Sequence, residues 1–179
     1  LKLSKLPNAV SMPLATALRS IAESNSGRPF EFHVLSDDFT ESMKKKVLDS
    51  LPVGSASIRW IPVDLSPFHG IWTREYISKM TFARFLIPKV FPDTISRVLY
   101  LDVDILVLDD LMQLWETDLE GAILGAVLDN LDARFKSGWQ GYKGVPCVMD
   151  YFNAGVLLID LDQWRKEGVS EKALAFMNQ

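Results

Sequence analysis

The stretch RVLYLDVDILVLDDL, residues 97–111, places four aspartates in an otherwise almost wholly apolar run. Val98 to Leu101 have the continuous apolar character of a buried strand, and Asp102 and Asp104 follow at once. Burying an ionised carboxylate without a partner costs free energy of the same order as the whole stability of a folded domain. A partner that offsets this cost is therefore expected.

A metal ion is one such partner. Residues i and i+2 of an extended strand point to the same side, so Asp102 and Asp104 should project together, with Val103 facing away. Converging carboxylates suit Mg²⁺ or Mn²⁺, and such an ion prefers a diphosphate at its remaining positions. The alternative is that the aspartates cap a turn or pair with Arg or Lys. The place of this D-x-D directly after an apolar strand favours metal binding.

Helical and strand patterns alternate along the chain. Such alternation is typical of an α/β domain with a mainly parallel sheet, in which ligands bind at the carboxyl ends of the strands. Asp102 lies at such an end. The expected strands are 30–35, 57–63, 98–101, 122–128 and 154–160; the expected helices are one capped by Ser11 that ends near Asn25, one from Thr40, an apolar one over 78–88, a turn at 111–115 and one capped by Ser170.

Composition excludes several classes of protein. The 179 residues are 48% hydrophobic and 23% charged, which predicts one well-packed globular domain. A net charge of −4, with no basic cluster longer than 44–46, argues against nucleic-acid binding. The aspartates interrupt the longest apolar segment, and the first residues lack the apolar core of a signal peptide. We expect a cytoplasmic protein, with peripheral contact to the inner membrane left open.

Arg84 is a second candidate site residue. Along the predicted helix it shares a face with Met80, Ala83 and Ile87, so its guanidinium would lie among apolar neighbours, where an unpaired charge is costly. A planar fork of donors that reaches a phosphate would offset that cost. Two alternatives stay open with equal weight: Arg84 extends to solvent, or it pairs with a buried aspartate.

A third candidate lies in YFNAGVLLIDLDQW, residues 151–164. Ala154 and Gly155 would let a ligand approach the backbone closely, and Asn153 can both donate to and accept from sugar hydroxyls. Taken alone, the same residues are more simply the tight start of a strand. Asp129 ends the preceding strand and should open into the same sheet edge as Asp102, although a turn-forming aspartate is the commoner explanation.

Residues 130–151 are polar, rich in glycine and aromatic residues, and long for a loop in a compact domain. Loops of that length are usually functional or mobile. They contain the single cysteine, Cys147, which is expected to be a filler and not a nucleophile because no histidine partner is evident.

Three motifs in order, RVLYLDVDILVLDDLMQLWETDLEG, LGAVLD and YFNAGVLLIDLDQWR, with TFAR upstream, resemble glycosyltransferase family 8. This family contains bacterial lipopolysaccharide galactosyl- and glucosyltransferases and glycogenin, and the resemblance covers the chain from about Pro13 onwards. It implies a GT-A fold, a Rossmann-like, mainly parallel sheet flanked by helices. It also implies transfer of galactose or glucose from a UDP-sugar to a saccharide or glycolipid acceptor, with retention of configuration and with Mn²⁺ or Mg²⁺ bridging protein and diphosphate.

The same resemblance assigns roles to individual residues. Asp102 and Asp104 would be metal ligands, Asp102 and the backbone of Val103 would lie near the ribose, and Arg84 would contact the donor's phosphate or sugar. The sugar site would be lined by Asp129, Asn153, Ala154 and Gly155, of which Asp129 and Asn153 are expected to be catalytic.

The sequence departs from the family pattern at both ends. The family's first strand, with its uracil-binding Ala-Asp-type motif, has at best Asn8 as a counterpart, and the C-terminal DQD-like and HxxGxxKPW-type segments, which supply a further metal ligand, are missing. We expect residues 1–179 to be a partial GT-A catalytic domain, its nucleotide-sugar-binding half, with little activity alone. The alternatives are a non-catalytic sugar-nucleotide-binding module and, less favoured, a haloacid-dehalogenase-type phosphohydrolase.

Overall fold

The computed structural model describes residues 10–36, 39–73, 78–129 and 152–178. The expected loop over 130–151, with Cys147, lies outside these ranges. The helices and strands run in the order α1 (Ser11–Ser24), β1 (Phe30–Ser36), α2 (Glu41–Asp49), β2 (Ala56–Pro62), η2 (Ser66–Phe68), η3 (Lys79–Leu86), α3 (Ile87–Val90), β3 (Arg97–Leu101), α4 (Met112–Trp115), β4 (Leu124–Leu128), β5 (Phe152–Asp160), α6 (Leu161–Lys166) and α7 (Val169–Met177).

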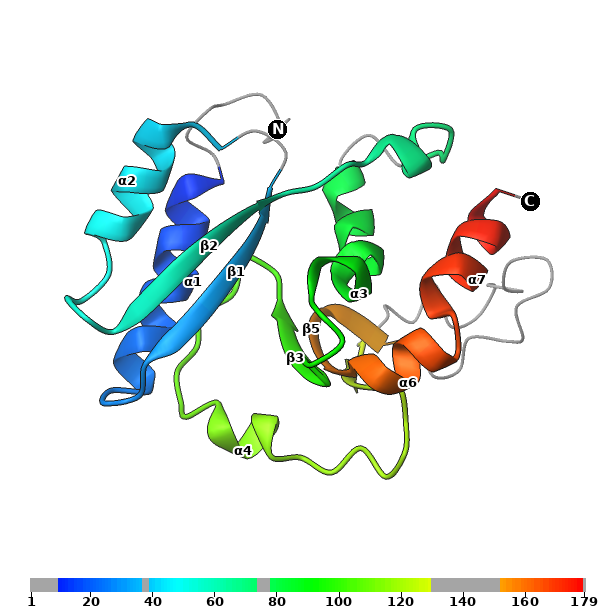
Figure 1. Ribbon diagram of the computed structural model, residues 1–179. Coiled ribbons are helices and arrows are strands. Elements are labelled where there is room, and N and C mark those ends of the chain that lie inside the picture. Colours follow the sequence, from blue (N-terminus) through cyan, green and yellow to red (C-terminus); the bar gives the residue numbers. More distant parts are fainter. Residues whose placement is uncertain (1–9, 37–38, 74–77, 130–151, 179) are drawn as a thin grey trace.

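The N-terminal part is a parallel pair of strands covered by two helices. β1 and β2 pair in parallel, from Phe30 opposite Ala56 to Ser36 opposite Pro62. Helix α2 provides the crossover that parallel neighbours need, and α1 and α2 lie side by side against one face of the pair (Figure 1). The core between them consists of Leu14, Leu18, Val34 and Val47, with Phe32, Ile58 and Trp60 packed against it.

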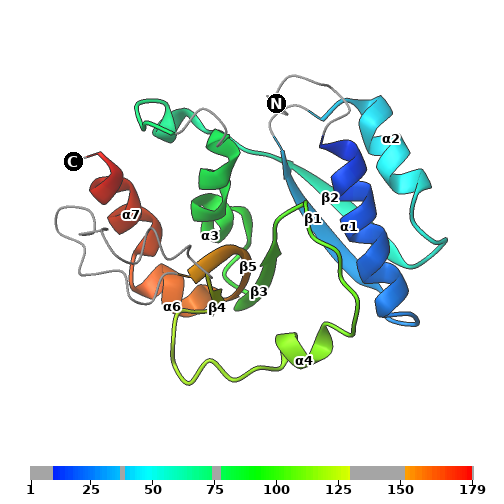
Figure 2. The same cartoon turned by 180° about the vertical axis from the view of Figure 1, so that it is seen from behind.

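The second sheet has the strand order β3-β5-β4, and both of its pairings are antiparallel. The α/β class is confirmed, and among the strands of the described ranges only β1 and β2 pair in parallel. Alternation along the chain predicts the elements, whereas the direction of pairing depends on the path of the connections between them. Strand β5 is central, and its Leu157, Leu158 and Ile159 are almost fully buried, with α6 and α7 beyond it (Figure 2).

One apolar cluster joins the two parts. Ile87, Leu157, Ile159, Leu161 and Trp164 form its buried centre, and partly buried side chains from β1, η3, β3, β4 and α7 pack around them. The β1 contribution is Leu35, so the N-terminal strand pair rests on the same core as the antiparallel sheet. Burying such side chains contributes about 1.5 to 3 kcal/mol each.

The helix start predicted at Thr40 is confirmed, whereas the caps predicted at Ser11 and Ser170 are wrong. The hydroxyl of Thr40 accepts a hydrogen bond from the Met43 amide, as expected at the start of α2. Ser11 is instead the first residue of α1, one position inside it, with its side chain buried. Ser170 lies inside α7, because its hydroxyl donates to the Phe85 carbonyl and accepts from the Trp164 indole.

The expected helix over 78–88 is present, but with a tighter turn. Ser78 caps it by accepting from the Met80 amide, and the chain winds as the 3₁₀ helix η3 up to Leu86. At its end the Ile87 amide donates to the carbonyl of Arg84, three residues back. Pro88 lies in the first turn of α3, where its missing amide hydrogen is tolerated, and it cannot donate to the Arg84 carbonyl in the α-helical pattern.

Helix α6 is an element that pattern analysis missed. Asp160 caps it, with Oδ1 accepting from the Gln163 amide at 2.9 Å. The aspartate three residues before a glutamine is a recognisable start signal, but it lies at the end of a strongly apolar strand pattern that masks it. In the part of the chain that the structure describes, no helix combines the length and apolar character needed to cross a membrane.

Candidate functional site

Antiparallel pairing brings the candidate residues to one edge of the second sheet. Leu101, the last residue of β3, lies opposite Val156, and Leu128, the last residue of β4, lies opposite Phe152. The carboxyl ends of β3 and β4 therefore meet the beginning of β5. The residues after β3 and β4 therefore lie close to the first residues of β5. Asp102 and Gly155 are neighbours in space, although more than 50 positions separate them in the sequence.

Asp102 is held at this edge by its backbone and by one side of its carboxylate. Its amide donates to the Gly155 carbonyl at 2.7 Å, which extends the strand pairing by one step. Its Oδ1 accepts from the Tyr100 hydroxyl at 2.6 Å and lies 3.5 Å from Nη2 of Arg84. The Asp102 side chain is 36% exposed, so the cost of burying it is lower than the sequence implies and is offset by these two partners.

Arg84 pairs with an aspartate, which is one of the two alternatives that the sequence left open. Its side chain is only 11% exposed. Nε donates to the Thr81 carbonyl at 2.8 Å, Nη2 donates to the Thr81 hydroxyl at 3.3 Å, and Nη1 donates to the Ala154 carbonyl. The guanidinium thus ties η3 to β5 and to Asp102, and its planar fork is suited to such simultaneous bonds.

Tyr100 is a site residue that the sequence analysis did not single out. Its ring lies under the Arg84 guanidinium, with 4.8 Å between the carbon Cζ and the ring centroid, a distance typical of a cation–π contact. Burial, and next the hydrogen bond to Asp102, raise the pKa of the phenol well above its ordinary value. The phenol therefore stays protonated and acts as a hydrogen-bond donor. Its signal in the sequence was only its place in an apolar strand.

Val103 and Asp104 differ from the extended geometry expected of them. β3 ends at Leu101, and both residues lie in a turn. Their side chains are exposed. Within the described ranges, the carboxylate of Asp104 has no hydrogen bond or ion pair, so both of its oxygens are available to a ligand.

Asn153 and Gly155 lie in the first part of β5, next to Asp102 and at an irregularity in the pairing of β5 with β4. The Gly155 amide donates to Oδ1 of Asn153 at 2.8 Å. A Cβ on Gly155 would lie 3.0 Å from that oxygen and 3.0 Å from Oδ2 of Asp102, closer than ordinary contacts allow. The lack of a side chain at residue 155 is therefore required for Asn153 and Asp102 to keep their places. Ala154 is half-buried, and its carbonyl is held by Arg84.

Asp129 follows β4 directly and is half-buried. Because Leu128 pairs with Phe152, Asp129 leaves the sheet at the same edge as Asp102 and Asn153. The structure thus brings together most of the residue set that the sequence predicted, with Tyr100 as an addition: Arg84, Asp102, Val103, Asp104, Asn153, Ala154 and Gly155 lie around the end of β3 and the start of β5. Asp129 lies two residues beyond Val127, which pairs with Asn153.

The carboxylates fit a divalent cation as part of its coordination shell. Asp104 and Oδ2 of Asp102 offer hard oxygen ligands of the kind that Mg²⁺ and Mn²⁺ take. Among the residues that the structure describes, no group of three or more histidine, cysteine, aspartate or glutamate side chains could hold a metal. Two carboxylates occupy only part of an octahedral shell, so a bound ion needs further ligands, such as phosphate oxygens or water.

The segment after the D-x-D is anchored to α1 by buried polar side chains. Ser20 accepts from the Val107 amide and Ser24 donates to the Val107 carbonyl, each at 2.9 Å. Asn25, only 4% exposed, accepts from the Leu111 amide at 2.8 Å. These side chains form hydrogen bonds with the backbone amides and the carbonyl of an irregular segment, which has no neighbouring strand to form them.

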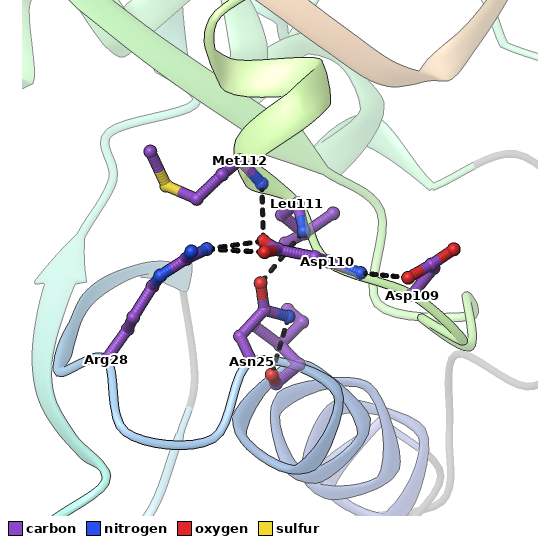
Figure 3. A network of polar contacts seen from close by, with 7 residues as sticks. Asn25, Arg28, Asp109, Asp110, Leu111 and Met112 are labelled. Carbon is purple, nitrogen blue, oxygen red and sulfur yellow. Dashed lines mark hydrogen bonds and ion pairs between the residues drawn. The ribbon is translucent and has the colours of Figure 1, made fainter.

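Asp109 and Asp110 lie directly before α4 and accept hydrogen bonds from backbone amides at its start. Oδ1 of Asp109 accepts from the Asp110 amide, and Oδ1 of Asp110 accepts from the Met112 amide, both at 2.8 Å (Figure 3). Arg28 donates to both oxygens of Asp110 at 2.6 Å. The bond from Met112, and next the contact with Arg28, lower the pKa of Asp110. The side chains of these two aspartates thus have structural partners, whereas that of Asp104 has none within the described ranges.

Substitution of Gly155 tests how tightly this edge is packed. Gly155→Ala is expected to destabilise the fold by about 1 to 2 kcal/mol, because the new methyl group must displace Asp102 or Asn153 from its hydrogen bonds. Chemical unfolding followed by circular dichroism measures the change. Gly70→Ala is the matched control, since a Cβ there meets nothing within 4 Å. Equal unfolding midpoints for the two variants would contradict the close packing.

Comparisons with known proteins agree on one family. The model of glycosyl transferase family 8 matches residues 10–179. General stress protein A of Bacillus subtilis is 29% identical over 154 residues, which cover 85% of this chain and 52% of that protein. Glycosyltransferase GlyF of Streptococcus pneumoniae is 31% identical over 167 residues, covering 93% of this chain and 38% of the relative. The chain thus spans about half or less of the length of these relatives.

A similar fold is present in solved structures. The galactosyltransferase LgtC, in complex with donor and acceptor sugar analogs, superimposes with a TM-score of 0.78 at 36% identity, covering 89% of this chain and 57% of that one. The WbbM bifunctional glycosyltransferase, at 19% identity and a TM-score of 0.73, supports the fold alone. The predicted GT-A fold is thereby confirmed.

Proposed function

Because this chain belongs to glycosyl transferase family 8, we propose that the protein transfers a hexose, galactose or glucose, from a UDP-sugar to an acceptor hydroxyl with retention of configuration and with the help of Mn²⁺ or Mg²⁺. One observation carries the proposal: carboxylates, an amide and a glycine from two strand ends, the end of β3 and the start of β5, meet at a single sheet edge, at Asp102, Asp104, Asn153 and Gly155. In α/β sheets, the ends of strands are where nucleotide ligands bind.

The two carboxylates have different surroundings and take different parts in this proposal. Asp104 is exposed and offers both oxygens, whereas Asp102 offers Oδ2 and is held through Oδ1. Together they would hold the cation, with Val103 and Asp102 next to the ribose. When bound, the cation supplies Lewis-acid stabilisation of the charge that builds up on the leaving UDP.

Arg84 contributes positive charge next to this site. Most of its donors are engaged by Thr81, Ala154 and Asp102, so its first task is to hold those groups in place. The proposal adds that its guanidinium attracts the donor's phosphates over a short distance. Precise placement of such groups matters because a shift of about 1 Å can lower a rate about a hundredfold.

The sugar side of the proposed site is formed by Asp129, Asn153, Ala154 and Gly155. The amide oxygen of Asn153 is used by the Gly155 amide, so the Asn153 NH₂ group remains to donate to a sugar hydroxyl. Gly155 leaves room for close approach of the hexose, and the carboxylate of Asp129 would accept from a hydroxyl. The proposal specifies the stereochemical outcome and assigns no nucleophile.

The acceptor in this proposal is a saccharide or a glycolipid, as in lipopolysaccharide biosynthesis. Support comes from the structural similarity to a galactosyltransferase that was solved with an acceptor sugar analog. A glycolipid acceptor would place the reaction at the cytoplasmic face of the inner membrane, which the protein would contact peripherally.

A panel of UDP-sugars tests the proposal on the full-length protein. UDP-galactose or UDP-glucose is expected to be turned over in the presence of Mn²⁺ and to be inert in the presence of a chelator. Proton NMR of the first sugar product should show the anomeric configuration of the donor. Tight donor binding without turnover, with acceptors supplied, would favour a non-catalytic sugar-nucleotide-binding module. Turnover of phosphate esters instead would favour the phosphohydrolase alternative.

A further inference from the structure

The two oxygens of the Asp102 carboxylate have unequal surroundings. Oδ1 accepts a 2.6 Å hydrogen bond from the Tyr100 hydroxyl and lies 3.5 Å from Nη2 of Arg84. Oδ2 faces Gly155, where a Cβ would lie 3.0 Å away. One oxygen is thus engaged by the protein, and the other is left for a ligand.

Tyr100 is in a position to enforce this asymmetry. It is the penultimate residue of β3 and pairs with Leu157 in the antiparallel register. Its ring packs against the apolar cluster around Trp164 and lies under the Arg84 guanidinium. Because the ring is fixed by strand pairing and by packing, its hydroxyl cannot follow a rotation of the carboxylate, and such a rotation would break the hydrogen bond.

We propose that Tyr100 is a positioning residue that limits Asp102 to coordination through one oxygen and thereby favours small, six-coordinate cations over Ca²⁺. This inference rests on the proposed metal-dependent binding of a UDP-sugar. Mn²⁺ and Mg²⁺ take about six ligands, whereas Ca²⁺ takes six to eight and readily accepts both oxygens of one carboxylate. A carboxylate with one oxygen already occupied is a poorer ligand for the larger ion.

The tyrosine hydroxyl, and not the ring, is the group that carries this effect. Tyr100→Phe removes the hydroxyl and keeps the ring under Arg84 and against the core. In the variant, only the 3.5 Å contact with Arg84 remains at Oδ1, so Asp102 can turn more readily and present both oxygens. The preference for Mn²⁺ over Ca²⁺ is therefore expected to fall about tenfold, the scale of one hydrogen bond to a charged group.

The test measures UDP binding by calorimetry on the full-length protein, in Mn²⁺ and in Ca²⁺, for wild type and Tyr100→Phe. The ratio of the two dissociation constants reports ion preference, and a loss of packing alone would weaken both equally. Ser170→Ala is the matched control, since it removes a hydroxyl that bonds to Phe85 and Trp164 in the same core without touching Asp102. Its ratio is expected to equal that of the wild type.

The outcomes separate this inference from the proposed function. If the wild type binds UDP equally well with and without Mn²⁺, the metal-dependent function fails. If Mn²⁺ supports binding but the ratio is the same in Tyr100→Phe and wild type, the role of Tyr100 fails. A second measurement needs no variant: a crystal structure of the wild-type Mn²⁺–UDP complex is expected to show one Asp102 oxygen on the ion, and two would overturn the inference.

Discussion

Asp104→Asn is expected to lower metal-dependent turnover of the UDP-sugar by about three orders of magnitude, the upper range for loss of one group that stabilises charge in a transition state. The amide keeps the shape of the side chain and removes its negative charge, so the cation loses one of the two carboxylates that the described chain offers it. The value of kcat/KM in saturating Mn²⁺ measures the loss.

The fold should not change in this variant. Asp104 is exposed and lies in a turn after β3, so its replacement is expected to alter the free energy of unfolding by less than about 0.5 kcal/mol. Asp49→Asn, which removes an exposed carboxylate paired with Lys45 on α2, is the matched control with wild-type kcat/KM. Retention of full Mn²⁺-dependent turnover by Asp104→Asn would show that the metal is held elsewhere.

Arg84→Lys is expected to reduce both stability and donor binding. One ammonium group cannot donate at once to the Thr81 carbonyl, the Ala154 carbonyl and Asp102, as the guanidinium does. We expect a loss of about 2 kcal/mol in the free energy of unfolding, since partly buried acceptors are left without donors. For a domain of this size, that corresponds to a Tm lower by about 4 to 8 °C.

The affinity for UDP in Mn²⁺ is expected to fall at least about tenfold in the same variant, because Asp102 loses a partner that holds it in place. Calorimetry measures the affinity, and scanning calorimetry measures Tm. Arg19→Lys is the matched control: Arg19 lies on the exposed side of α1, pairs with Glu23 and donates to the Ser50 carbonyl. Because both contacts are exposed to solvent, little change is expected. An unchanged Tm for Arg84→Lys would mean that the contacts of the Arg84 guanidinium contribute nothing net to stability.

Much of the secondary structure could be predicted from local patterns. The cap at Thr40, the alternation in β1 and the apolar run of β5 each act within a few residues, so sequence spacing predicts α2, β1 and β5 within one or two positions. Predictions of helix starts were wrong where a side chain hydrogen-bonds to a residue that is distant in the sequence. Ser170 reads as a helix cap in the sequence, but its hydroxyl bonds to Phe85, which is 85 residues away.

The candidate site divides in the same way. A D-x-D after an apolar strand and an Asn-Ala-Gly before another are visible in the sequence, because the residue types themselves indicate ligands and close approach. The contacts of Tyr100 and Arg84 with Asp102 are not visible there. They depend on the antiparallel register of β3 and β5 and on the placement of η3 above them.

The amino-acid order alone settles the family, the α/β class and the identity of the residues that meet at the sheet edge, because these follow from motifs and from short-range periodicity. Only the tertiary structure decides that β5 pairs antiparallel with β3 and β4, and that the Arg84 guanidinium contacts the Asp102 carboxylate. It also decides that one oxygen of Asp102 is engaged by Tyr100 while Asp104 is left exposed. The reason is physical: the energy of a partly buried carboxylate depends on donors that are brought to it from other elements, and their distance is set by packing and not by sequence spacing.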